Sequence, residues 1–169
     1  GEKPIIIIEN SDTFDLAIKL IYEYEYINKS IENENIMNSS TKLPFVLNLA
    51  SNFKPGGGVE KGSRAQEEDL YRRSNYFLAN NPEFYPLNIF ECIYSPLVHI
   101  IKNNKGNLLF KPEIVSCLAM AAFRNPKVKM INNILTYEKQ SQEKIMQKKK
   151  DMIIKDAIKQ GHQILVLGA

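Results

Sequence analysis

Two short motifs in the middle of the chain contain the residues best suited to chemistry. The first is Pro55-Gly56-Gly57-Gly58-Val59, and the second, Gln66-Glu67-Glu68, begins after the seven residues that follow the last glycine. Three consecutive glycines let bare backbone approach a ligand, and two adjacent carboxylates nearby can transfer protons. Together the motifs indicate a phosphate-bearing substrate and acid–base chemistry.

Each motif also has a purely structural interpretation. A glycine run after a proline can be a plain surface turn, and acids in the first turn of a helix complement its dipole. Asp69 fits the second explanation, and Gln66-Glu67-Glu68 could equally be a capping feature. The spacing alone leaves both interpretations open.

The glycine segment does not match the common nucleotide-binding loops. Gly57 and Gly62 have the spacing of a P-loop, but Ser63-Arg64 follows where Lys and Ser or Thr are required. Lys61 occupies the place of the third glycine of a dinucleotide-binding fingerprint counted from Gly56. A kinase-type or dehydrogenase-type loop is therefore excluded. What remains is a loop whose amides can converge on an anion such as a diphosphate.

Hydrophobic patterns predict an α/β fold with the motifs at the end of a strand. We expect buried strands at Ile5 to Ile8, Phe45 to Ala50 and Ile164 to Leu167, because each is a short apolar run. The second strand leads directly into the glycines, and ligands in open α/β sheets collect at the carboxyl ends of strands. Ala65 to Leu78 is predicted to be the next helix, with the glutamate pair in its first turn and with Leu70, Ser74 and Phe77 on one side.

The remaining segments of the first 125 residues have less regular hydrophobic patterns. Asn10 to Thr13 supplies capping residues for a helix that follows, and residues 28–42, rich in Asn and Ser, predict a mobile surface loop. Glu91 to Ile101 and Glu113 to Ala122 are ambiguous between strand and helix. The apolar positions of the first helix are Phe14, Ala17, Ile18 and Ile21.

A charged helix is predicted from Tyr137 to Gln160, and Gly161 ends it. Lys148-Lys149-Lys150 is interpreted as part of its solvated face rather than a nucleic-acid contact. The apolar stripe of this helix consists of Ile145, Ile153, Ile154, Ala157 and Ile158.

Composition limits the class of protein. A chain of 169 residues with 44% hydrophobic residues fits a single domain, and an excess of three basic residues is too small to predict a DNA-binding surface. No apolar run approaches the ~20 residues that cross a bilayer, so we expect no membrane span. Cys92 and Cys117 lack metal-ligand spacing, which predicts buried thiols and an intracellular protein, cytoplasmic or nuclear. His99 is expected in the core or an edge strand, and Arg124 in a surface ion pair.

The two motifs and their gap resemble the signature of poly(ADP-ribose) glycohydrolases of the microbial type, a macrodomain family. Val46 to Ser51, Asp69 to Ser74, Tyr94-Ser95-Pro96 and Leu165 to Ala169 are similar to that family as well. The resemblance implies a macrodomain-like three-layer sandwich over residues 1–169, with a mixed, mostly parallel sheet between helices. It also implies hydrolysis of the ribose–ribose O-glycosidic bonds of poly(ADP-ribose), or action on ADP-ribosylated proteins, with ADP-ribose as product and without a metal or other cofactor.

The resemblance assigns roles to the motif residues. Glu68 is similar to the catalytic acid that protonates the departing ribose oxygen and then activates water at the anomeric carbon. Glu67 resembles its partner, which hydrogen-bonds ribose hydroxyls, and Asn48 is expected to be structural support. The positions similar to substrate-binding residues are Ser51, Asn52, Gly56, Gly57, Gly58, Val59 and Gln66.

The chain departs from the family pattern at its end. In the family, the strand corresponding to Ile164 to Leu167 leads into a second phosphate loop and further elements, so we expect a fold that lacks C-terminal elements. The alternative function is a macrodomain that binds ADP-ribose without cleaving it. Ala119 to Asn125 fits the family pattern only loosely, and its role stays open.

Overall fold

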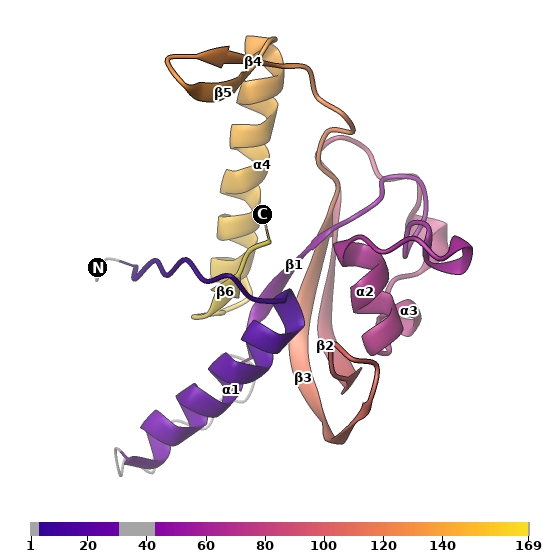
Figure 1. Cartoon of the computed structure of the whole chain (residues 1–169), viewed down its shortest axis with the longest axis vertical. Coiled ribbons are helices and arrows are strands. Elements are labelled where there is room, and N and C mark those ends of the chain that lie inside the picture. Colours follow the sequence, from indigo (N-terminus) through magenta and orange to yellow (C-terminus); the bar gives the residue numbers. More distant parts are fainter. Residues whose placement is uncertain (1–3, 31–42, 169) are drawn as a thin grey trace.

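The chain forms a four-stranded sheet with helices on both faces, as Figure 1 shows. The structure is a computed structural model that describes residues 4–30 and 43–168. The elements in chain order are α1 (Thr13–Ser30), β1 (Phe45–Leu49), η1 (Val59–Lys61), α2 (Gln66–Arg73), α3 (Tyr76–Ala79), η2 (Pro82–Phe84), β2 (Cys92–Lys102), β3 (Leu108–Met120), β4 (Val128–Ile131), β5 (Ile134–Tyr137), α4 (Gln140–Lys159) and β6 (Leu165–Val166). No helix within these ranges is both long and apolar enough to cross a bilayer.

The sheet has the strand order β2-β3-β1-β6. β1 pairs in parallel with both of its neighbours. In this register, Phe45 lies opposite Ser116 of β3 and Leu165 of β6. β2 is antiparallel to β3, so two of the three pairings are parallel. The predicted mixed, mostly parallel sheet is therefore confirmed. β4 and β5 form a separate hairpin near the start of α4 (Figure 1).

Two apolar clusters fill the space on opposite faces of the sheet. Val46 packs with Phe14 of α1 and Leu70 of α2 in the first cluster. Its neighbours in the strand, Phe45 and Leu47, belong to the second cluster, which Ile153 and Ala157 of α4 complete. Successive strand residues point to opposite faces, so β1 contributes to both clusters. The resulting arrangement of helix, sheet and helix confirms the predicted three layers.

The N-terminal segment differs from the prediction. Ile5 to Ile8 forms no strand, and its side chains are between 74% and 97% exposed. The strand prediction was wrong because an apolar run forms a strand only where another strand pairs with it, and no described strand pairs with this segment. The capping prediction is confirmed, since Asp12 Oδ1 accepts a hydrogen bond from Asp15 N at 2.9 Å.

The predicted surface loop starts later than expected. Residues 28–30 belong to α1, so the prediction of a loop from residue 28 was wrong there. Residues 31–42 lie outside the described ranges.

The helix predicted from Ala65 to Leu78 is divided at Ser74. This residue has an extended backbone and bridges to Ile100 of β2. Its hydroxyl donates to Leu70 O at 2.6 Å and accepts from Tyr76 N at 3.2 Å. The bridge to Ile100 holds Ser74 in this extended conformation, and the helix ends here because Ser74 leaves the helical backbone conformation. Phe77 is consequently 59% exposed instead of sharing a face with Leu70.

The two ambiguous segments are the long antiparallel strands β2 and β3. Their strand character comes from their pairing across the sheet, which local patterns do not reveal. His99 lies on β2, the edge strand, as predicted. Cys117 is fully buried in β3, whereas Cys92 is only partly buried, and both are free thiols.

The predicted apolar stripe of α4 is only partly correct. Ile153 and Ala157 are buried, but Ile154 and Ile158 are 46% and 67% exposed. Lys149 is only 4% exposed, because its Nζ donates to Ala121 O at 2.5 Å, so the solvated interpretation was wrong for this lysine.

The boundaries of the predicted C-terminal helix and strand also differ in part from the prediction. Tyr137 belongs to β5 rather than to the helix. The final strand contains Leu165 and Val166, whereas Leu167 is 52% exposed. Gly161, with φ of 80°, follows the helix as predicted.

The difference in burial along α4 gives a stability test. We expect Ile153→Ala to lower the free energy of unfolding by ~2–4 kcal/mol, because it leaves a cavity between α4 and the sheet. Ile158→Ala on the exposed side should change it by less than ~0.5 kcal/mol. Urea denaturation followed by circular dichroism measures both values, and equal losses for the two variants would contradict this packing.

Candidate active site

A cleft of about 520 Å³ lies at the carboxyl end of β1. Its walls come from Leu49 to Phe53, from the glycine segment with the start of α2, and from Ala122 to Arg124. Of the predicted site residues, Ser51, Asn52, Gly57, Gly58, Glu67 and Glu68 line the cleft. Gly56, Val59 and Gln66 lie outside its lining. The predicted meeting of the glycine motif and the glutamate pair is confirmed.

The glycine segment requires glycine at two positions. Gly56 and Gly57 have φ of 71° and 52°, in the left-handed region that side chains disfavour. A Cβ atom on Gly56 would lie 2.7 Å from Cδ1 of the Tyr71 ring, and one on Gly57 would lie 2.6 Å from Glu68 Oε1. The loop is therefore pressed directly against α2.

Glu67 is buried and hydrogen-bonded at both carboxylate oxygens. Its Oε2 accepts from Ser51 N at 2.7 Å, and its Oε1 accepts from Gly56 N at 3.2 Å and from Asn48 Nδ2 at 3.3 Å. The side chain thus joins the end of β1 to the first glycine. Asn48 supports the site as the sequence predicted, and its own Oδ1 is buried without a partner in the described part of the chain.

Glu68 is hydrogen-bonded on one side only. Its Oε1 accepts from Gly58 N at 2.8 Å. Its Oε2 is buried and has no hydrogen-bond partner among residues 4–30 and 43–168. Because buried carboxylate oxygens normally have partners, this one is a position where a proton or a ligand hydroxyl can be held.

The loop amides have partners other than those the sequence suggested. We expected the amides of the three glycines to converge on a diphosphate. Instead Gly56 N and Gly58 N donate to the two glutamates, and Gly57 N donates to Lys54 O at 3.4 Å. Ligand contact through Gly57 and Gly58, which line the cleft, stays a prediction.

Burial raises the pKa of Glu67 above its ordinary value. Removal of the carboxylate from water is the largest cause, and the negative charge of Glu68 acts in the same direction. The hydrogen bonds from Ser51, Asn48 and Gly56 oppose the rise because they stabilise the ionised form.

Gln66 fixes the start of α2 to β1. Its Oε1 accepts from Leu49 N at 2.7 Å, and its Nε2 donates to Leu47 O at 2.8 Å. The side-chain amide thus pairs with the strand backbone as a neighbouring strand would. The proposed contact between Gln66 and substrate stays a prediction, but the structure gives this side chain a structural task.

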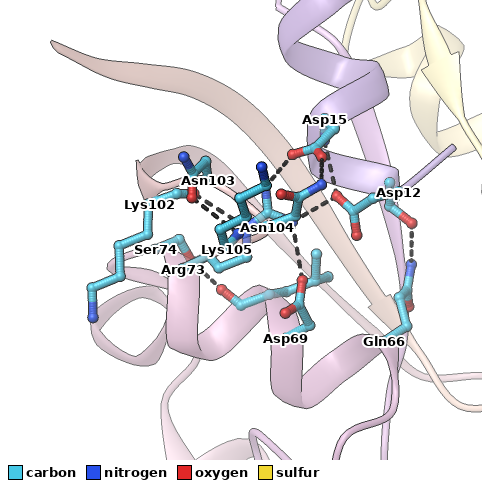
Figure 2. A network of polar contacts seen from close by, with 12 residues as sticks. Asp12, Asp15, Gln66, Asp69, Arg73, Ser74, Lys102, Asn103, Asn104 and Lys105 are labelled. Carbon is cyan, nitrogen blue, oxygen red and sulfur yellow. Dashed lines mark hydrogen bonds and ion pairs between the residues drawn. The ribbon is translucent and has the colours of Figure 1, made fainter. Parts of the chain in front are cut away.

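Arg73 fixes the end of α2, as Figure 2 shows. It is 2% exposed and pairs with three carboxylates, Asp12 at 2.6 Å, Asp15 at 2.5 Å and Asp69 at 3.1 Å. Its Nε also donates to Lys102 O at 3.1 Å. The helix that carries both glutamates is therefore anchored to α1 and to the end of β2. The carboxylate of Asp69, predicted to complement the helix dipole, thus also has a specific ion-pair partner.

Sequence reasoning missed several residues that shape the site. Tyr71 packs against Gly56, and its hydroxyl accepts from Asn80 Nδ2 at 2.7 Å. Asn80 Nδ2 also donates to the hydroxyl of Tyr85 at 3.0 Å. The sequence contained one signal for Tyr71: it follows Glu67 by four residues, and residues at this spacing lie on the same face of a helix. Arg124 was predicted in a surface ion pair, but it forms none with any described residue and lines the cleft.

Groups of histidine, cysteine, aspartate and glutamate that could hold a metal ion are absent from the described ranges. His162, the other histidine, contacts Tyr94 and Leu43 O on the α4 side of the sheet.

The raised pKa of Glu67 predicts a pH effect on stability. A group whose pKa is raised by folding contributes its stability at low pH, and that contribution is lost as pH rises through the folded-state pKa. Compared with Glu67→Gln, the parent protein should therefore lose free energy of unfolding as pH increases above about 4.5, the ordinary glutamate value.

Denaturant unfolding between pH 4 and 7 measures this difference, with the exposed Glu143→Gln on α4 as control. At every pH we also expect Glu67→Gln to be destabilised by ~1–3 kcal/mol, because one main-chain N–H loses its acceptor. Parallel pH profiles for parent and Glu67→Gln would show that burial does not raise this pKa.

Comparison with known proteins agrees with the fold and motifs. Residues 2–103 match the family described as the microbial-type PARG catalytic domain. The structure is similar to poly(ADP-ribose) glycohydrolase from Thermomonospora curvata, with a TM-score of 0.71 and 24% identity over 100% of this chain and 58% of that chain. The inhibitor-bound (ADP-HPD) structure from that organism has a TM-score of 0.64 and 22% identity over 93% of this chain and 55% of that chain.

A third similar structure is the T267R mutant of the Deinococcus radiodurans glycohydrolase in complex with ADP-ribose. It has a TM-score of 0.50 and 29% identity, covering 68% of this chain and 43% of that chain. The present chain thus spans less than two thirds of the solved proteins it resembles. A search of curated proteins found no match.

Proposed function

This chain belongs to the microbial-type PARG catalytic-domain family, and from that premise we propose that it hydrolyses ribose–ribose O-glycosidic bonds of poly(ADP-ribose) and releases ADP-ribose. The observation that carries the proposal is Glu68, a buried carboxylate in the cleft with one oxygen held by Gly58 N and the other without a described partner. A single acid that is fixed on one side and free on the other suits proton transfer.

One glutamate can serve both halves of the reaction. Protonated Glu68 gives its proton to the departing ribose oxygen as the bond from that oxygen to the anomeric carbon breaks, leaving an oxocarbenium-like sugar. The ionised carboxylate then accepts a proton from water as the water oxygen bonds to the anomeric carbon. Glu68 ends the cycle protonated, so atoms and charges balance without another reactant.

Glu67 holds the substrate and the loop in this scheme. A carboxylate has about four acceptor positions. Its known donors are Ser51 N, Gly56 N and Asn48 Nδ2, which leaves room for one ribose hydroxyl. Its task is to orient the sugar beside Glu68.

The substrates are proposed to be poly(ADP-ribose) or ADP-ribosylated proteins. The ADP-ribose complex of the Deinococcus radiodurans relative supports ADP-ribose as the ligand of the cleft. An intracellular location, cytoplasmic or nuclear, is part of the proposal, and the free thiols of Cys92 and Cys117 support it.

The assignment of Glu68 predicts a selective loss of turnover. Glu68→Gln should lower the rate of polymer hydrolysis by ~10²-fold or more, because the amide cannot exchange protons in this way. Its affinity for ADP-ribose should stay within about threefold of the parent value, since the amide can still accept a hydrogen bond from Gly58 N. A gel assay of polymer length and calorimetry with ADP-ribose measure the two quantities.

Glu60→Gln is the matched control, because Glu60 lies on η1 near the glycines with 81% of its side chain exposed. It should retain the parent rate. Polymer cleavage by Glu68→Gln at the parent rate would contradict the assignment. A parent protein that binds ADP-ribose but never shortens the polymer would be the non-catalytic binding module.

A further inference from the structure

A second cavity of about 400 Å³ borders the segment between the glycines and α2. Gly62 and Arg64 line this second cavity, whereas Ser63 and Ala65 line the catalytic cleft. Alternate residues of one short segment therefore face two different spaces. The segment thus separates the catalytic cleft from the second cavity.

The second cavity is lined by two guanidinium groups and one carboxylate. Arg72 donates through Nη2 to Val59 O and Ser63 O, which holds its guanidinium beneath the loop. Asp69 is already paired with Arg73 at 3.1 Å. Arg64 is exposed and forms no hydrogen bond or ion pair with the described residues. The cavity thus has a net positive charge and an unengaged arginine.

We propose that this second cavity binds a pyrophosphate of the polymer adjacent to the ADP-ribose unit in the cleft. The inference rests on the proposed function and extends it, because the leaving ribose oxygen carries the rest of the polymer. Glu68, which protonates that oxygen, lies in the first turn of α2, three residues beyond Ala65. In this proposal, the departing polymer passes beside the segment that presents Arg64. The planar guanidinium group of an arginine suits a phosphate, because it can donate two parallel hydrogen bonds to the phosphate oxygens.

The proposal predicts that Arg64 affects the polymer but not the monomer. Binding is measured in the Glu68→Gln background, which prevents cleavage during the measurement, using ADP-ribose and purified polymer of two to four units. Arg64→Ala should weaken polymer binding by ~10-fold, as expected for the loss of charge-assisted hydrogen bonds, and leave ADP-ribose binding within twofold. It should also reduce the slope of log Kd against log salt concentration for the polymer by ~0.7.

Lys159→Ala is the matched control, because it removes the same charge from an exposed position at the end of α4. It should change neither affinity. Arg64→Lys should restore part of the salt dependence, since the charge returns without the planar fork.

The outcomes separate this inference from the proposed function. Equal polymer affinities for the Arg64→Ala and Lys159→Ala variants, with ADP-ribose still bound, would overturn the subsite and leave the hydrolase intact. Equal weakening of monomer and polymer by Arg64→Ala would place Arg64 in the cleft itself and also overturn the subsite. Failure of the parent protein to bind either ligand would overturn both proposals.

Discussion

Two buried carboxylates have to be satisfied by main-chain amides, and the rest of the site depends on this constraint. An ionised carboxylate removed from water is costly unless donors surround it. Here the donors are three amides of the segment that follows β1: Ser51 N and Gly56 N for Glu67, and Gly58 N for Glu68. The loop conformation and the positions of the two glutamates are therefore one structure, because each holds the other in place.

The surrounding residues make that arrangement possible. Left-handed backbone at Gly56 and Gly57 turns their segment toward α2, where no Cβ atom would fit. Gln66 pairs the start of α2 with the backbone of β1, and Arg73 ties its end to α1 and β2. Because both ends of this short helix are fixed, the glutamates in its first turn meet the glycines in one geometry. Tyr71 adds a rigid wall behind Gly56.

Local signals in the sequence were sufficient for part of this picture. β1, the capped start of α1 and the position of the glutamates in the first turn of a helix all follow from short apolar runs, capping residues and spacing. The exposure of Ile5 to Ile8, the interruption at Ser74 and the anchoring by Arg73 could not be predicted in this way. Each depends on partners distant in sequence: strand neighbours for the first, Ile100 for the second, and Asp12, Asp15 and Lys102 for the third. The partners of the loop amides were missed for the same reason, since the pattern shows which amides are accessible but not which acceptor is nearer.

The hydrogen bonds also distinguish two glutamates that are neighbours on one helix. Glu67 is directed toward the end of β1 and meets three donors, so both of its oxygens are fixed. Glu68 is directed toward Gly58 and meets one donor, so its second oxygen has no described partner. Consecutive helical residues diverge by ~100°, and the loop meets each of them with a different part of its backbone. This difference in hydrogen bonding favours Glu67 as the positioning carboxylate and Glu68 as the one that exchanges a proton, because proton transfer requires an oxygen that is not already committed to a main-chain donor.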